Sequence, residues 1–406
     1  MSIVVRSARA DELEAHGKLR EEGYGFAAGY GVGAMAPFHD PDMLDRLLGA
    51  HDGDTGELAG TLAVVPFGQC FGGRVIRMGG VGGVVVAPHR RGEGVASLLL
   101  ARAVEDMRVR GETISALGPA TMGVYRRAGW AIAGDQHWST VPTAALAHLS
   151  GDSSELLVRR STDADSADCQ RVYDRAAVKS NGMVIRPAFA WESRLRAQAG
   201  RYRYVVCDRS SGEMVGYVIY REQRAARGGY QLFVDDLHAT SWGAEAALWR
   251  LLGAQEAQAR EVVVCGLSLA ALQSRLPEQV CKTVHEHQWM LRLNDAPAAV
   301  AARGYAPAIT ASVLLRLTDP MVVTNNGRFT LIVQNGSGAL VPTAESTSGE
   351  PVLTLDIGTL SALYSGHVSA YSLAAAGKLD GAHDADLANL DAIFRGAPSV
   401  MAIEEF

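Results

Sequence analysis

A turn with two glycines spaced one residue apart, Arg91-Gly92-Glu93-Gly94, is the stretch of this sequence best suited to chemistry. It follows a β-branched run at residues 84–86 and precedes an apolar run that starts at Val95. Glycine lets a backbone approach a ligand closely, and the first turn of a helix offers unpaired N–H groups at the positive end of its dipole. A strand, this turn and a helix would therefore cradle a pyrophosphate.

Other phosphate-binding loops do not fit this turn. A Walker loop needs Gly-Lys-Ser/Thr, which does not follow here, and the three-glycine spacing of the dinucleotide fingerprint is missing. The alternative interpretation is a glycine-rich connection between a strand and a helix that binds no ligand.

Tyr125 is a second candidate, within the segment Met122-Gly123-Val124-Tyr125-Arg126-Arg127-Ala128-Gly129-Trp130. A phenol with a pKa of about 10 stays protonated at neutral pH, so it can donate a proton to a leaving group. The alternative is that the ring packs against a ligand and transfers no proton.

Both motifs resemble those of the GNAT acyltransferase superfamily. Arg91, Gly94 and Ala96 fill the defined positions of its acetyl-CoA motif, Arg/Gln-x-x-Gly-x-Gly/Ala, and the second segment resembles its closing motif, Tyr-x-x-x-Gly-aromatic. The resemblance implies acetyl-CoA as the co-substrate, backbone hydrogen bonds from the strand to the pantetheine arm, and Tyr125 as the acid that protonates the CoA thiolate. The cofactor-binding residues that it implies are Val84, Val85, Val86, Arg91, Gly92, Glu93, Gly94, Val95 and Ala96.

The order of segments and the ending Ala402-Ile403-Glu404-Glu405-Phe406 resemble the Eis (enhanced intracellular survival) acetyltransferases. This resemblance implies that the terminal carboxylate of Phe406 is the general base, that the substrate is an aminoglycoside, whose acetylation gives antibiotic resistance, and that the chain forms a homohexamer. A carboxylate with a pKa of about 3.5 is charged at neutral pH and could hold a cationic amine. The alternative is a frayed tail.

Tyr24, Phe26 and Glu405 are the candidates for contact with the substrate. Aromatic residues near a helix end can equally belong to the core. Gly82 and Gly83 stand where the best-known Eis proteins carry bulkier residues, and together with Gly80 they predict a more open or differently shaped substrate pocket.

Three segments must position these residues, and together they predict an α/β (α+β) protein. Residues 1–145 are the predicted catalytic GNAT domain, with strands before the glycine turn and, after it, an amphipathic helix that stops at Gly111. Residues 146–296 are predicted to be a degenerate second GNAT domain, because they repeat the same order of elements but lack the glycine turn. Residues 297–406 are the predicted sterol-carrier-like α/β domain, which supplies the C-terminal carboxylate and contains a hairpin at Asn335-Gly336.

Composition narrows the class of protein. The 406 residues are 48% hydrophobic and 20% charged with a formal net charge of −6, which fits a globular protein and argues against nucleic acid as a partner. Five cysteines without a CxxC pair indicate a reducing cytoplasm. A charged N-terminal segment and the lack of a long apolar run predict neither a signal peptide nor a membrane span. His285 and His287 have no evident third ligand, so we expect no metal.

The leading hypothesis is therefore an acetyl-CoA-dependent N-acetyltransferase that acts on amines of a cationic small molecule. Attack of the amine on the thioester gives a tetrahedral oxyanion, which backbone N–H groups of residues 84–86 could stabilise. One alternative is an N-acyltransferase of natural-product biosynthesis that uses another acyl-CoA, or an N-acyltransferase that acts on peptide or protein lysine. Another is a lipid or sterol carrier with an inert GNAT scaffold, which predicts an apolar tunnel and tight lipid binding.

Overall fold

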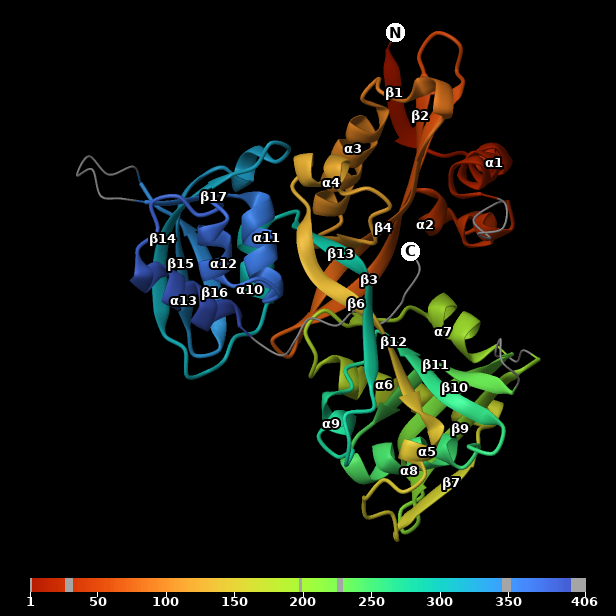
Figure 1. The fold of residues 1–406 in the computed structure, drawn as a ribbon. Helices are drawn as coiled ribbons and strands as arrows, with labels where there is room; N and C mark the ends of the chain where they lie inside the picture. Colours follow the sequence, from red (N-terminus) through yellow and green to blue (C-terminus); the bar gives the residue numbers. More distant parts are fainter. Residues whose placement is uncertain (1, 26–31, 197–198, 225–228, 345–351, 396–406) are drawn as a thin grey trace. The chain divides into compact units, whose positions relative to one another are not determined.

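The computed structural model describes residues 2–25, 32–196, 199–224, 229–344 and 352–395. Of these, residues 2–134 and 288–395 form one compact unit, and residues 135–287 form a second (Figure 1). Within the described ranges, no helix is both long enough and apolar enough to cross a membrane. None of the five cysteines, all of which lie in the described ranges, forms a disulfide.

The N-terminal part of the first unit is built on a mixed sheet with the order β1-β2-β3-β4-β5-β13. Strand β4 pairs antiparallel with β3 and parallel with β5. The strands are β1 (Ile3–Ser7), β2 (Leu47–Asp52), β3 (Leu58–Phe71), β4 (Arg74–Val86), β5 (Ile114–Leu117) and the end of β13 (Lys282–Leu293). The helices are α1 (Leu13–Tyr24), α2 (Pro41–Leu44), α3 (Val95–Val109) and α4 (Met122–Arg127), with 3₁₀ turns at Ala10–Glu12, Val32–His39 and Pro88–Arg90.

Helices α1 and α3 cover opposite faces of this sheet. Successive side chains of a strand point to opposite faces. Val85 of β4 packs with Leu19 of α1, whereas its two neighbours pack into the cluster that contains α3. Helix α3 buries Val95, Leu99, Leu100, Ala103, Val104 and Met107, which is the spacing of one helix face. It ends just before Gly111, which has a φ of 71°, so the predicted helix and its glycine stop are confirmed.

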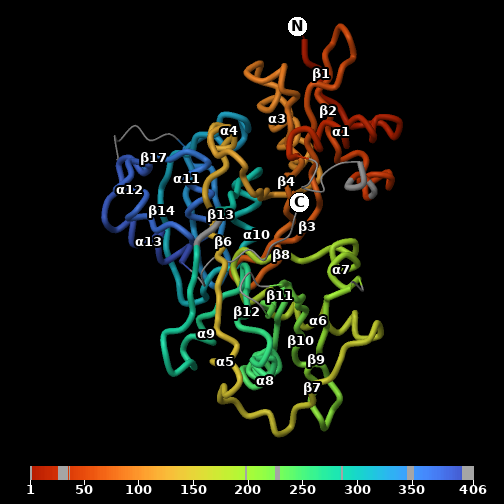
Figure 2. The backbone as a smooth tube through the Cα atoms, turned by 45° about the vertical axis from the view of Figure 1, so that its right-hand side comes forward, coloured from red at the N-terminus to blue at the C-terminus, as the bar shows by residue number. Residues whose placement is uncertain are grey.

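The C-terminal part of the first unit is a four-stranded sheet with the order β16-β15-β14-β17, covered by helices (Figure 2). Helix α10 contacts β16, and α13 contacts both β14 and α11. Asn335 and Gly336 have φ values of 50° and 72° in the turn between β15 and β16, which confirms the predicted hairpin. The elements are β14 (Ala311–Thr318), β15 (Gly327–Gln334), β16 (Ser337–Pro342), β17 (Leu353–Asp356), α10 (Ala296–Ala302), α11 (Ile357–Ser365), α12 (Ala370–Ala375), α13 (Asp384–Phe394) and a 3₁₀ turn at Val323–Asn325.

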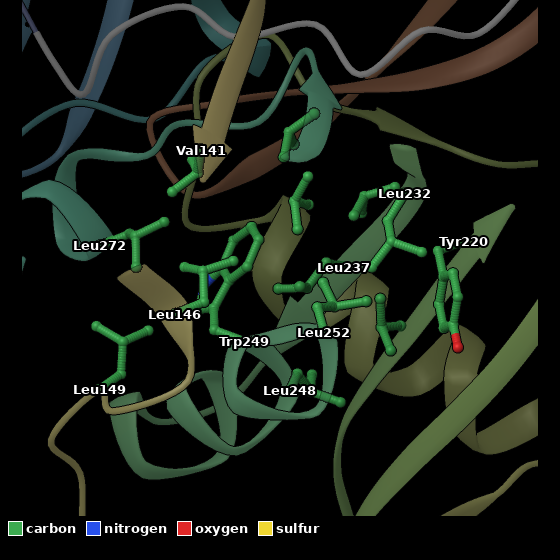
Figure 3. Close-up of a cluster of buried hydrophobic side chains, with 14 of the residues drawn as sticks. Val141, Leu146, Leu149, Tyr220, Leu232, Leu237, Leu248, Trp249, Leu252 and Leu272 are labelled. Atoms are coloured by element: carbon green, nitrogen blue, oxygen red, sulfur yellow. The ribbon is translucent and has the colours of Figure 1, made fainter. Parts of the chain in front are cut away.

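The second unit repeats the architecture of the first sheet. Its order, β7-β9-β10-β11-β12-β6, shows the same succession of antiparallel pairs with one parallel pair, β11 with β12, joined by helix α8. Side chains of α8, among them Trp249, pack against β11 and β6 in its core (Figure 3). The elements are β6 (Ala131–Pro142), β7 (Leu156–Arg160), β8 (Val184–Ile185), β9 (Arg201–Asp208), β10 (Met214–Arg224), β11 (Tyr230–Ala239), β12 (Ala259–Cys265), α5 (Thr143–Leu146), α6 (Ser166–Ala177), α7 (Ala188–Leu195), α8 (Trp242–Gly253), α9 (Ala270–Gln273) and a 3₁₀ turn at Asp163–Asp165.

The two repeats exchange their closing strands. Strand β6 follows the first repeat in the sequence but pairs with β12, and β13 follows the second repeat but pairs with β5. The α/β class and the internal repeat are thus confirmed, and the domain limits near residues 145 and 296 stay predictions.

Candidate functional site

Strand β4 has an open edge beside the predicted pyrophosphate turn. Its pairing with β5 runs from Met78 and Ile114 to Gly80 and Ala116 and, over the part of the chain that the structure describes, goes no further. Strand β4 continues to Val86 and stays paired on its other side with β3. The backbone groups of residues 81–86 on the β5 side can therefore pair with an extended ligand, as an added strand would.

A β-bulge shapes this edge. Thr61 pairs with Val85 and Ala63 pairs with Gly82, so Gly83 and Val84 together face a single residue of β3. Gly83 has a φ of 60°, which residues with a Cβ seldom adopt. The bulge thus turns the backbone of β4 at Gly83 and Val84, the first of the three valines.

The guanidinium of Arg20 fills the space beside this glycine. A Cβ on Gly83 would lie 2.6 Å from Cζ of Arg20, whose side chain comes from α1 and is 4% exposed. The sequence predicted a more open or differently shaped pocket at Gly80, Gly82 and Gly83, and at Gly83 the side chain of Arg20 takes up the space that a Cβ would need. The glycine makes room for a buried cation.

Tyr24, at the end of α1, reaches the same edge. Its pKa is raised by burial, against the opposing effects of Arg20 and of a backbone hydrogen bond from Val84. Because the N–H groups of a strand lie in the plane of its sheet, this bond puts the Tyr24 hydroxyl at the edge of β4. The N–H of Val84 was a candidate donor to an oxyanion, and in this structure the tyrosine accepts its hydrogen bond.

Tyr125 lies on α4 and is 7% exposed. Burial raises its pKa, and the neighbouring Tyr24 raises it further. Its ring meets that of Trp130 edge to face, with 6.3 Å between the centroids. The structure thus brings the two predicted tyrosines together and keeps the phenol of Tyr125 protonated.

The predicted pyrophosphate turn lies at the start of α3 and fits an anion. Gly92 and Gly94 have φ values of 86° and 82°, and no heavy atom of the described residues lies within 4 Å of a Cβ built on either. Gly94 is the N-cap residue of this 15-residue helix, and no side chain in the described ranges caps it. Val95 is 1% exposed with its side chain in the core, so it can offer a ligand only its backbone.

Arg90, which sequence analysis did not single out, holds this turn in place. Its guanidinium donates to Glu93 at 2.8 Å and to Asp52 at 3.0 Å, and it is 6% exposed. Backbone hydrogen bonds from Thr55 and Asp54, followed by the bond from Arg90, lower the pKa of Asp52 to about 2. The side chain of Glu93 is therefore engaged within the protein, whereas that of Arg91 is exposed.

The corresponding helix of the second repeat has no such cradle. The Ser241 side chain caps α8 by accepting from the N–H of Ala244. Trp242 donates to the carbonyl of Ser150, and a Cβ on Gly243 would lie 2.4 Å from the carbonyl oxygen of Asp152. The start of α8 is thus capped and covered, in line with the predicted degeneracy of this repeat.

Three predicted site residues, Phe26, Glu405 and Phe406, lie outside the described residues. The chain is described as far as Arg395, and a buried arginine holds the helix that precedes it. Arg303 donates to the carbonyl of Phe394 at 2.9 Å and also to that of Tyr364. Aromatic rings surround its guanidinium, from Phe71, Tyr305, Tyr364 and Phe394.

Comparison with known families matches all three segments. Models of the acetyltransferase (GNAT) domain match residues 4–133 and 182–293, and a model of the sterol carrier protein domain matches residues 296–402. The predicted order of two GNAT domains and a sterol-carrier-like domain is confirmed.

Individual relatives match over most or all of the chain. A crystal structure titled GCN5-related N-acetyltransferase, from Kribbella flavida, is 32% identical with a TM-score of 0.86, and the match covers 100% of this chain and 98% of that one. The N-acetyltransferase Eis of Mycobacterium tuberculosis is 28% identical over 82% of this chain and 81% of its own length. An uncharacterized N-acetyltransferase of Streptomyces coelicolor is 28% identical over 84% of this chain and 85% of its own length.

Proposed function

Since the chain belongs to the GCN5-related N-acetyltransferase family, in its Eis-like group, we propose that it transfers the acetyl group of acetyl-CoA to amines of an aminoglycoside. The observation that carries this proposal is one continuous edge in the first repeat. The uncapped start of α3, the open edge of β4 and the phenol of Tyr125 follow one another there.

The residues present fit acetyl-CoA. Backbone N–H groups from Gly92 to Ala96 would hold the pyrophosphate, which the dipole of α3 favours. Residues 84–86 would pair with the pantetheine arm along the open edge of β4, where the ligand would take the N–H of Val84 over from Tyr24. Arg90 would act indirectly by fixing the turn, and Arg91 is free to approach the phosphates from solvent.

In the proposed reaction, the amine nitrogen attacks the acetyl carbonyl carbon and gives its proton to the terminal carboxylate of Phe406. The bond from that carbon to sulfur then breaks, and the thiolate takes the phenolic proton of Tyr125. A buried guanidinium from Arg20 beside the β4 bulge favours the neutral form of a nearby amine, which is the form that attacks.

The choice of substrate rests on charge and on the relative that carries the Eis name. A formal net charge of −6 favours a cationic substrate. The buried cation of Arg20 works against several positive charges at the reacting centre. We therefore propose that one uncharged amine enters next to Arg20 while the other amines of the substrate stay closer to solvent.

The test measures release of the CoA thiol with acetyl-CoA and a panel of aminoglycosides, a polyamine and a lysine peptide. Turnover with aminoglycosides is the expected result. Turnover only with the peptide, or only with longer acyl thioesters, would replace this substrate class with one of the acyltransferase alternatives. If no combination of acyl donor and amine gives turnover and the protein binds a lipid tightly, the result would favour the alternative of a lipid or sterol carrier.

A chain extended beyond Phe406 tests the proposed base, because the extension removes the terminal carboxylate from that residue. We expect the extended chain to lose turnover while its binding of acetyl-CoA is unchanged. Retained turnover would place the base elsewhere.

A further inference from the structure

Three potential metal ligands meet between α1 and the sheet, at the end of the helix opposite Tyr24. Glu12 and His16 are four residues apart and so lie on one helix face, and His51 lies on β2. Among the residues that the structure describes, each of these three offers a ligand atom, and the three atoms lie within 4.8 Å of one another. His16 is fully buried, and His51 is 7% exposed.

In each imidazole, the hydrogen bond of Nδ1 determines whether Nε2 carries a proton or a lone pair. Nδ1 of His51 lies 3.4 Å from the carbonyl of Gly56, which can only accept, so this nitrogen carries the proton and Nε2 keeps its lone pair. Nδ1 of His16 lies 2.7 Å from the hydroxyl of Thr61, which can accept in the same way. Neither Nε2 has a hydrogen-bond partner within the described ranges, although both are buried.

Gly49 leaves room for the two imidazole rings. A Cβ on Gly49 would lie 2.6 Å from Nε2 of His51 and 3.2 Å from Cε1 of His16. Gly49 and His51 are two residues apart on β2 and share one face of the sheet, the face that α1 covers. The lone pair on Nε2 of His51, the lone pair that Nε2 of His16 offers when Thr61 accepts from Nδ1, and a carboxylate therefore converge, and no described residue donates to either Nε2.

We propose that Glu12, His16 and His51 bind a divalent transition metal ion of the zinc class, with a water as the fourth ligand. Two imidazoles and one carboxylate suit zinc or cobalt, whereas magnesium and calcium prefer oxygen ligands alone. The bonds from Thr61 and Gly56 to the two Nδ1 atoms orient the rings, as outer ligands of zinc histidines commonly do.

Two arginines compete with the ion for Glu12. Arg6 donates to both carboxylate oxygens, at 2.6 and 2.8 Å, and Nη2 of Arg9 donates to Oε1 at 2.8 Å. The Arg9 side chain is 63% exposed, against 33% for Arg6, so it is the partner that the ion displaces. Metal binding is therefore an exchange of one guanidinium for the ion, and removing Arg9 should strengthen it.

The test titrates the full chain, stripped of metal with a chelator, with Zn²⁺ in competition with a chromophoric chelator. We expect one equivalent to bind, with a Kd about 100-fold higher for His51→Gln. Arg9→Gln should lower the Kd several-fold, and His148→Gln, which changes an exposed histidine far along the sequence, should leave it unchanged. Zn²⁺ should also raise the Tm of the wild type and of Arg9→Gln but not that of His51→Gln.

Circular dichroism shows whether His51→Gln still folds, and visible absorption of the wild type with Co²⁺ gives a test without any variant. Intense bands of four-coordinate cobalt are expected. The proposal is overturned if the wild type binds no Zn²⁺, if His51→Gln binds it equally well, or if Arg9→Gln binds it more weakly. None of these readouts depends on acetyl transfer, so the proposed function and this site can fail separately.

Discussion

At the scale of single residues, Tyr125 has the environment that a proton donor to a buried thiolate needs. Burial raises its pKa, and a low-dielectric site raises the basicity of a departing thiolate as well, so the two groups stay matched. We predict that Tyr125→Phe lowers kcat by about 10²- to 10⁴-fold, the usual effect of losing a general acid. The KM for acetyl-CoA should change little, because the ring still packs on Trp130.

Steady-state release of the CoA thiol measures both constants. Tyr24→Phe is the matched control, since it also removes one phenol, and it should act mainly on the KM of the amine. An unchanged kcat for Tyr125→Phe would assign the ring to packing alone.

His16 should make the stability of the protein depend on pH. Burial lowers its folded pKa from about 6.5 to about 4. Between these two values the unfolded chain binds a proton that the folded chain does not, so the free energy of unfolding falls as pH falls from 6.5 to 4. The loss due to this residue is about 3 kcal/mol.

Urea denaturation at pH 7 and pH 4.5, with a chelator present, measures most of that loss. His16→Gln should be less stable at pH 7 because it alters a buried contact with Thr61, yet it should lose less stability between the two pH values. Equal losses in the two proteins would assign the pH dependence to other groups.

At the scale of elements, the starts of α3 and α8 show why one repeat fits a cofactor and the other does not. Gly94→Ala should strain the backbone of the turn by about 1–2 kcal/mol, because Gly94 has a φ of 82°. The added Cβ would clash with no described residue, so the backbone conformation is the only source of this strain. We expect this variant to raise the KM for acetyl-CoA. Ser241→Ala should lower the free energy of unfolding by about 1 kcal/mol through the lost cap and leave turnover unchanged.

Enzyme kinetics and urea denaturation of the two variants check this contrast. An unchanged KM in Gly94→Ala would remove the turn from the proposed cofactor site. A fall in turnover for Ser241→Ala would mean that the second repeat contributes more than a scaffold.

The sequence was sufficient for elements whose signal is local. The apolar spacing of α3, its stop at Gly111 and the Asn335-Gly336 hairpin are properties of a few adjacent residues. The sequence also predicted an amphipathic helix in the segment of α1, but its buried face was harder to predict, because His16 and Arg20 are polar side chains on that face. The spacing of four from Glu12 through His16 and Arg20 to Tyr24 was a visible signal, but its meaning depends on which strands lie beneath the helix.

The residues of the candidate site likewise divide into those that the sequence predicted and those that it did not. The glycine turn and Tyr125 were found because each belongs to a short motif. Arg20 and Arg90 were missed because their partners, Gly83 and Asp52, are distant in the sequence. The roles predicted for Phe26, Glu405 and Phe406 stay predictions, since these residues lie outside the described ranges.

At the scale of the whole molecule, buried contacts join segments that the family models match separately. Strand β13 closes the first sheet, and its Arg292 forms a fully buried pair with Asp319 of the C-terminal segment, at 2.7 Å. Asn294 follows the same strand, and its carbonyl accepts from Asn325. Because buried charges are costly to separate, the first GNAT domain and the sterol-carrier-like domain should unfold together.

A contact between two glycine backbones gives the sharpest test of that coupling. Gly304 donates to the carbonyl of Phe71 at 3.2 Å, and a Cβ on Gly304 would lie 1.9 Å from the carbonyl oxygen of Gly72. Gly304→Ala must therefore push the C-terminal domain away from the β3–β4 hairpin. We predict a loss of about 1–3 kcal/mol, the usual range for overpacking, and a lower Tm by calorimetry.

The same variant should lower kcat if the C-terminal domain supplies the base, because the proposed carboxylate would move with it. Gly358→Ala is the matched control, since it adds the same methyl group to the same domain at a place where the nearest atom is 3.4 Å away. Loss of stability with normal kcat would confine the contact to a structural role. Equal Tm and kcat in the two variants would show that the hairpin and the C-terminal domain are not coupled through this contact.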